Sequence, residues 1–133
     1  MSHIIADRIV ETSNTIGTGA YILLGGVTGY RPASSECAYG DTFEYYAEDI
    51  DANGAVTGPW EIGTGTFGPG NILVRTTILK STNSGLAVNW LAGTRRIAMA
   101  ITSDTFTAIT ADFAQLATSL INTQILLVTY VTT

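Results

Sequence analysis

The residues that could act as a nucleophile and its base are few. The sequence has one cysteine, Cys37, and one histidine, His3. A cysteine nucleophile needs an adjacent base, and His3 lies in an N-terminal segment that we expect to be mobile. Cys37 falls in a stretch rich in loop-forming residues, so we interpret it as an inert thiol. With no nucleophile and base set, we expect no catalytic residue and no enzymatic activity.

A short acidic segment, Asp49–Gly54, opens like a calcium loop of the EF-hand type. Carboxylate and amide oxygens at alternate positions are the ligands that a hard cation prefers. The twelfth position of such a loop should be a glutamate, but here it is Trp60, and Pro59 precedes it. We therefore interpret the segment as an acidic β-turn and expect no metal ligand, with a weaker calcium site of another type as the alternative.

A glycine-rich segment, Gly63–Gly68, has the spacing of a dinucleotide-binding loop. In that loop the glycines let a pyrophosphate approach the start of a helix. Pro69 and Gly70 follow at once, which favours a turn over a helix. The pattern is typical of a strand end followed by a turn, and we expect no cofactor.

Carboxylates also gather around one predicted strand, residues 42–48. Alternation places Phe43 and Tyr45 on one face and Glu44, Tyr46 and Glu48 on the other. We interpret the second face as the solvated side of an edge strand, where charge discourages stray pairing. Tyr46, opposite the apolar face, is the candidate for a contact with another protein.

Composition limits the classes of partner. The chain has 133 residues, of which 46% are hydrophobic and only 13% charged, with a net charge of −5. Scarce charge suggests a surface that is partly buried in an assembly. The six basic residues are scattered, so we expect no nucleic-acid partner. The apolar run Ile125–Val128 is too short for a membrane span, and we expect neither a secretory signal nor a membrane.

Short apolar segments separated by glycine-rich turns predict mainly strands. The spacing of three and four over residues 111–122 predicts one short helix with Thr110 as its N-cap. We expect an all-β (mainly) chain: an antiparallel β-sandwich or jelly-roll-like single domain, 1–133, with one short C-terminal helix. The predicted strands are residues 4–11, 20–24, 42–48, 60–67, 72–79, 86–90, 95–101 and 125–131.

The last of these strands carries the other candidate interface residues. Ile125, Leu127, Thr129 and Val131 alternate along it, and a β-branched strand can add to the sheet of a neighbouring chain.

A series of short motifs, taken in order, resembles a known β-rich module. The module belongs to virion structural proteins of tailed bacteriophages and is often found at the N-terminus of tail-fibre-like proteins. The resemblance covers about residues 5–100, and 101–133 form a C-terminal helix-plus-strand extension. The motifs are Ala6–Thr12, Gly17–Leu23, Gly25–Tyr30, Gly40–Thr42, Tyr45–Tyr46, Asp51–Gly54, Trp60–Phe67, Leu73–Leu79, Ser81–Asn83 and Ala92–Thr94.

The resemblance implies a non-enzymatic structural role in the virion, through protein–protein assembly at the tail or fibre attachment. The expected partners are other virion proteins and further copies of the chain in a homo-oligomer. The expected localisation is the virion, after synthesis in the host cytoplasm. Capsid decoration, as a cement protein, is one alternative. A carbohydrate-binding module for host recognition is an alternative of a different class.

Overall fold

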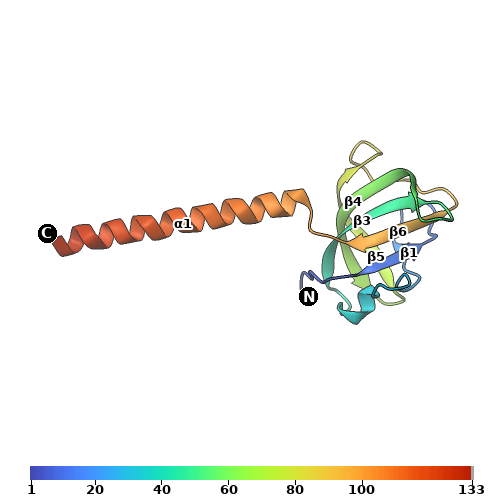
Figure 1. Cartoon of the computed structure of the whole chain (residues 1–133), viewed down its shortest axis with the longest axis horizontal. Helices are drawn as coiled ribbons and strands as arrows, with labels where there is room; N and C mark the ends of the chain where they lie inside the picture. The colour runs from blue at the N-terminus through green and yellow to red at the C-terminus, as the bar shows by residue number, and fades with distance from the viewer. Residues whose placement is uncertain (133) are drawn as a thin grey trace. The chain divides into compact units, whose positions relative to one another are not determined.

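The chain divides into two compact units, Met1–Ile101 and Thr102–Thr133. The computed structural model describes the backbone of residues 1–132 and the side chains of residues 1–124. The first unit, called the β unit here, holds the strands, and the second holds one helix (Figure 1). The elements are β1 (Val10–Ser13), β2 (Tyr21–Ile22), η1 (Ala33–Ser35, a 3-10 helix), β3 (Thr42–Ile50), β4 (Val56–Gly68), β5 (Ile72–Ser81), β6 (Thr94–Met99) and α1 (Ser103–Thr132).

The strands of the β unit form one antiparallel sheet in the order β1-β6-β3-β4-β5-β2. The segment after β2 reaches the opposite edge of this sheet. There the amide of Leu24 donates to the carbonyl of Thr12 (2.9 Å), and the amide of Val27 donates to the carbonyl of Val10 (2.9 Å). The sheet is therefore curled and nearly closed on itself. The mainly-β antiparallel class with one C-terminal helix is confirmed, with the strands in one curled sheet.

Alternation along the strands places the core inside this sheet. Phe43, Tyr45 and Ala47 of β3 are buried, as predicted. In β4 the inward positions include two glycines, which leave room for the large side chains of neighbouring strands. The hydrophobic core consists of Ile9, Tyr21, Leu23, Ala33, Cys37, Phe43, Tyr45, Ala47, Phe67, Leu73, Val88, Trp90 and Ile97.

β3 does not lie at the edge of the sheet, so the solvated-edge interpretation is wrong. It pairs with β4 on one side and with β6 on the other. Glu44 is buried, and the carboxylate of Glu48 accepts hydrogen bonds from Arg96 of β6 (2.9 and 2.6 Å). The pairing with β6 joins residues about 50 positions apart, such as Glu48 and Arg96, and local alternation carries no signal for it.

The predicted strand over residues 86–90 is also wrong. Only Trp90 makes a β-bridge there, with Gly17 on a distant segment. The amide of Val88 instead donates to the side chain of Glu61 (2.9 Å). The buried carboxylate of Glu61 thus accepts the backbone hydrogen bond that a neighbouring strand would otherwise accept.

The predicted helix is confirmed but is much longer than residues 111–122. It has 30 residues and begins at Ser103. Thr102, rather than Thr110, is its N-cap, because its Oγ1 accepts from the amide of Thr105 (3.2 Å). Thr110 lies inside the helix, where its hydroxyl donates to the carbonyl of Phe106 (2.9 Å).

The predicted strand over residues 125–131 is wrong, because the backbone there is helical. Once a helix has begun, each further residue gains one hydrogen bond for one ordered residue, and this continuity can override β propensity. Strand alternation does not apply to a helix, so it no longer supports the predicted interface of Ile125, Leu127, Thr129 and Val131. Their side chains lie outside the described residues.

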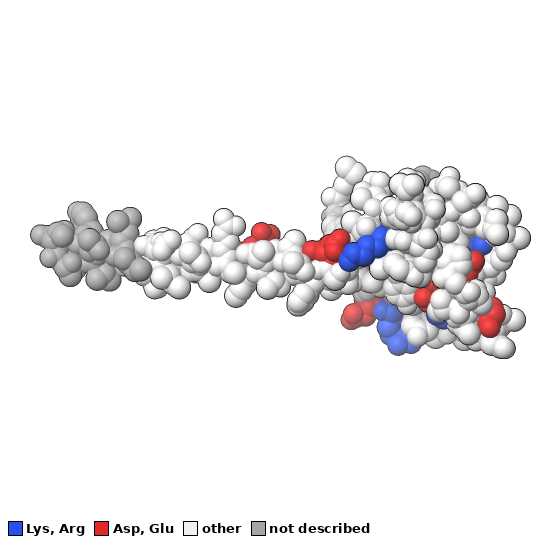
Figure 2. Space-filling model, turned by 90° about the horizontal axis from the view of Figure 1, so that it is seen from above, with Lys and Arg blue, Asp and Glu red and all other residues white. Residues whose placement is uncertain are grey.

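Charge is sparse on the surface. In Figure 2 most of the visible surface that is described is neither basic nor acidic, and the charged side chains are scattered. Among the described residues, no helix is both long and apolar enough to cross a membrane.

Candidate functional site

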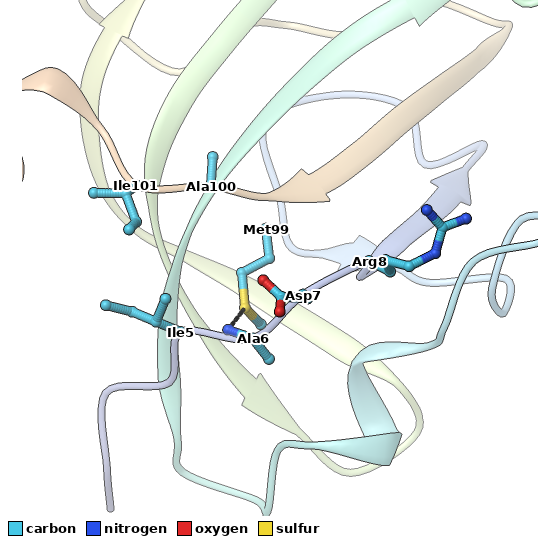
Figure 3. Close-up of a pocket in the computed structure, with 7 residues that line it drawn as sticks. All are labelled: Ile5, Ala6, Asp7, Arg8, Met99, Ala100 and Ile101. Atoms are coloured by element: carbon cyan, nitrogen blue, oxygen red, sulfur yellow. Dashed lines mark hydrogen bonds between the residues drawn. The ribbon is translucent and has the colours of Figure 1, made fainter.

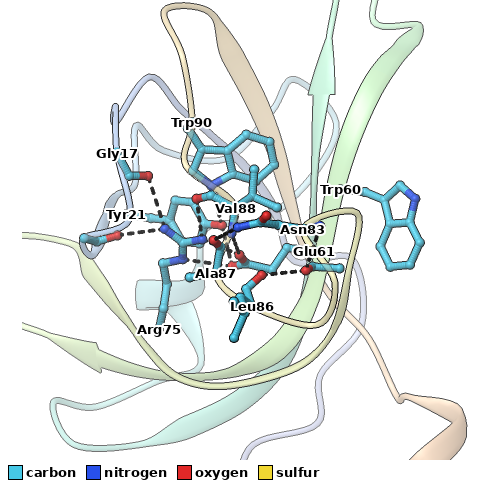
Figure 4. A network of polar contacts seen from close by, with 12 residues as sticks. Gly17, Tyr21, Trp60, Glu61, Arg75, Asn83, Leu86, Ala87, Val88 and Trp90 are labelled. Atoms are coloured by element: carbon cyan, nitrogen blue, oxygen red, sulfur yellow. Dashed lines mark hydrogen bonds and ion pairs between the residues drawn. The ribbon is translucent and has the colours of Figure 1, made fainter.

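The carboxylate of Glu61 is fully buried at the centre of a polar network (Figure 4). Its Oε2 accepts from the hydroxyls of Tyr21 (2.7 Å) and Tyr45 (2.6 Å) and from Nε of Arg75 (2.9 Å). Its Oε1 accepts from Nη2 of Arg75 and from the amide of Val88 (2.9 Å). Five donors therefore surround one carboxylate.

A second layer of contacts holds these donors in place. Nε1 of Trp90 donates to the hydroxyl of Tyr21 (2.9 Å), and Nη2 of Arg75 donates to the carbonyl of Val88 (2.9 Å). The guanidinium of Arg75 also lies over the Tyr21 ring, 5.0 Å from its centroid. The side chains of Tyr21, Tyr45, Glu61, Arg75 and Trp90, with the backbone of Val88, are called the Glu61 network below.

The charges of the Glu61 network are fixed by its surroundings. Burial alone would raise the pKa of Glu61, but hydrogen bonds from Arg75, Tyr45 and Val88 outweigh it and lower that pKa. Burial raises the pKa of Tyr21 and of Tyr45, and the nearby Glu61 carboxylate adds to both shifts. At neutral pH the carboxylate is charged and both phenols are protonated. Both carboxylate oxygens of Glu61 already accept hydrogen bonds. The arrangement therefore links the strands that carry these residues and offers no free base.

The acidic segment that resembles a calcium loop covers the end of β3 and the turn to β4, where the amide of Gly54 donates to the carbonyl of Asp51 (3.0 Å), so the β-turn interpretation is confirmed. Oδ1 of Asp51 accepts from the amides of Asn53 (2.8 Å) and Ala55 (3.0 Å). Oδ1 of Asp49 lies 2.9 Å from Nε of Arg95, without the alignment of a hydrogen bond. Among the residues whose side chains are described, 1–124, no group of three or more His, Cys, Asp and Glu residues could hold a metal ion.

The glycine-rich segment Gly63–Gly68 lies within β4, so the strand interpretation is confirmed. A Cβ at Gly63 would collide with the backbone carbonyl of Thr77 on β5 and would lie 2.9 Å from Oη of Tyr45. A Cβ at Gly65 would lie 2.5 Å from Cδ1 of Leu73. These glycines permit close packing inside the sheet, and no helix begins there.

The single cysteine is buried and the single histidine is exposed. Burial, with the charges of Asp41 and Glu36, raises the pKa of Cys37 to about 11. Nδ1 of His3 lies 2.8 Å from Oγ1 of Thr42. At neutral pH the cysteine is therefore a protonated thiol, as an inert cysteine should be.

Cys37 of the native chain is expected to react with a disulfide reagent about a hundred-fold more slowly at about pH 8 than an ordinary cysteine, because its raised pKa leaves little thiolate. The measurement is the release of the coloured thiolate from the reagent over time. The chain unfolded in urea is the control, and its thiol should react at the ordinary rate. Equal rates for the native and unfolded chains would contradict the buried thiol.

One cavity lies between the N-terminal segment and the residues that follow β6 (Figure 3). Its volume is about 220 Å³, below the roughly 300–1,000 Å³ of sites for drug-sized ligands. The amide of Ala6 donates to Sδ of Met99 (3.2 Å) across it. The lining is mostly backbone and aliphatic side chains, with Asp7 and Arg8 as the charged members. This cavity offers no convergent set of polar groups.

Tyr46, the predicted contact residue, is half-buried on β3 and alternates with the buried Tyr45. Its role in a contact stays a prediction. The other aromatic side chains are divided between core and surface. In the β unit the exposed ones are Tyr30, Tyr39 and Trp60, at 44%, 66% and 38%.

A row of exposed large apolar side chains lies on α1, and the sequence analysis did not predict this exposure. Every described residue from Phe106 to Gln124 is exposed. The spacing of three and four begins at Phe106 and Ile109, before the predicted start of the helix. This spacing is the signal from which the apolar stripe could have been predicted. The large exposed apolar side chains are Phe106, Ile109, Phe113, Leu116, Leu120 and Ile121.

Comparison of the chain with protein-family models, with curated proteins and with solved structures gave no match. The function therefore has to be inferred from the residues and geometry of the chain itself. Two features stand out: a polar network that serves the stability of the β unit, and a helix with an uncovered apolar surface.

Proposed function

We propose that the chain is a non-enzymatic structural protein of a tailed-phage virion, and that it acts through protein–protein assembly at the tail or fibre attachment. The observation that carries the assembly role is α1. Its described residues from Phe106 to Gln124 are all exposed, although six of them are large and apolar. A row of exposed large apolar side chains is typical of a protein–protein contact.

The virion setting is supported by the ordered motifs of residues 5–100, which resemble the phage module. The β unit fits a supporting role, because its most buried charged groups are used internally. Glu61 and Arg75 pair with each other, and the guanidinium of Arg95 donates to the carbonyls of Thr15 (3.0 Å) and Gly93 (3.1 Å). These groups hold the unit together and leave recognition to its surface and to the helix.

Purified virions whose genome encodes the chain provide the test. Capsids and tails are separated, and each fraction is examined by quantitative mass spectrometry. We expect the chain in the tail fraction at low copy number. High copy number in the capsid fraction would support the decoration alternative instead, and absence from both fractions would overturn the virion role.

A further inference from the structure

We propose that α1 is a coiled-coil segment through which identical copies of this chain associate with one another. The contact surface is an apolar stripe on α1, called the seam here: Phe106, Ile109, Phe113, Leu116 and Leu120. This inference concerns the chain's association with itself and stands whether or not the chain belongs to a virion.

The spacing of the seam is the pattern of a coiled coil. Its residues follow one another at steps of three, four, three and four, the repeat that places side chains on one stripe of a supercoiled helix. All five side chains are more than half exposed. In the sequence the same spacing continues at Thr123, Leu127 and Tyr130, and the side chains of the last two lie outside the described residues. The repeat thus extends over more than three heptads of a 30-residue helix.

The helix has little to stabilise it when it stands alone. It contains no basic residue, so no ion pair between successive turns supports it. The hydroxyls of Thr110, Thr118 and Thr123 donate to the carbonyls four residues earlier, contacts that weaken rather than strengthen a helix. Most helical stability in proteins comes from packing of an apolar face. A helix of this composition therefore needs a partner that buries the seam.

The flanks of the seam favour identical copies over a different partner. In coiled coils the charged residues beside the seam select the partner. Here the flanking positions carry Thr110, Asp112, Ala117, Ser119 and Gln124, so only one is charged. After Asp112 the sequence has no charged residue at all. Copies of the chain can approach with little repulsion, and the flanks present no charge pattern for an oppositely charged partner.

The test is the molar mass of the full chain in solution, measured by sedimentation equilibrium over a range of concentrations. The wild-type chain is expected at two or more times its 14.0 kDa. Leu116→Gln places a polar group in the seam and should raise the dissociation constant at least about tenfold. Ile121→Gln is the matched control, since Ile121 is exposed to a similar degree (56% against 58%) but lies off the seam.

Circular dichroism and tryptophan fluorescence show whether the β unit of each variant stays folded, because both tryptophans lie in that unit. We expect unchanged fluorescence in both variants and loss of helical signal on dissociation of Leu116→Gln. A wild-type chain that is monomeric at all concentrations would overturn the proposal. If Leu116→Gln and Ile121→Gln weakened association equally, or if Leu116→Gln left the oligomer intact, the seam would not be the contact surface.

Discussion

Replacing Glu61 with glutamine is expected to lower the free energy of unfolding by about 3–5 kcal/mol, the loss typical of breaking a buried ion pair. The substitution leaves Arg75, whose side chain is 3% exposed, with an uncompensated buried charge. It also weakens the acceptor for the hydroxyls of Tyr21 and Tyr45. The measurement is urea unfolding followed by tryptophan fluorescence, to which Trp90, buried beside the network, contributes.

Glu48→Gln is the matched control for this experiment. It removes an ion pair with Arg96 whose side chains are 18% and 30% exposed. Partly solvated pairs of this kind contribute about 0–1 kcal/mol, so the control should unfold close to the wild type. Similar losses in Glu61→Gln and Glu48→Gln would contradict a special role for the Glu61 network.

Acid should reduce the difference between the wild type and Glu61→Gln. Because the folded chain holds the pKa of Glu61 below its ordinary value, the carboxylate contributes stability that is complete above the unfolded pKa, about 4.3. That contribution is lost as the pH falls below this value through the folded pKa. The gap in Tm between the two proteins should therefore be constant near neutral pH and narrow below about pH 4.

Replacing Gly63 with alanine is the second change with a large expected effect. The new methyl group would collide with the carbonyl of Thr77 and lie 2.9 Å from Oη of Tyr45. Overpacking of this kind costs about 1–3 kcal/mol, and we expect the upper end because the colliding atom belongs to the backbone of β5. The measurement is the shift of the urea unfolding midpoint.

Gly68→Ala is the control for the glycine experiment. Gly68 lies in the same strand, but a Cβ there would have no neighbour within 4 Å. This variant should be as stable as the wild type or slightly more stable, because alanine restricts the unfolded chain. A loss in Gly68→Ala equal to that in Gly63→Ala would show that the close approach of β4 to β5 is not the cause.

Much of the β unit could be predicted because its signals are local. Alternation of Phe43 and Tyr45 located the inward face of β3, and the acidic segment Asp49–Gly54 located the turn that follows. The inner position of β3 in the sheet could not be predicted, since it depends on pairing with β6, about 50 residues further along the chain. Local periodicity gives the elements of a sheet, and long-range pairing decides which of them lie at an edge.

The Glu61 network was missed for a related reason. Glu61 lies an even number of residues from the buried Phe67 in β4, and Arg75 lies two residues from the buried Leu73 in β5, so both lie at inward positions. A charged residue at such a position is the signal that two strands share a buried ion pair. The length of α1 was missed because residues 125–131 have strong β propensity, which the continuity of the helix overrides.

The pairing of β1 with β6 also sets an order of events during synthesis. Val10 pairs with Ala98, so the sheet cannot close until nearly all of the β unit has left the ribosome. Such distant pairings make folding slow, because loop-closure entropy is lost before the contacts form. The nascent chain therefore exposes its unpaired strands for most of its elongation. Residues 102–133 emerge after the β unit, so the segment that we propose for association is completed when the β unit is already able to fold.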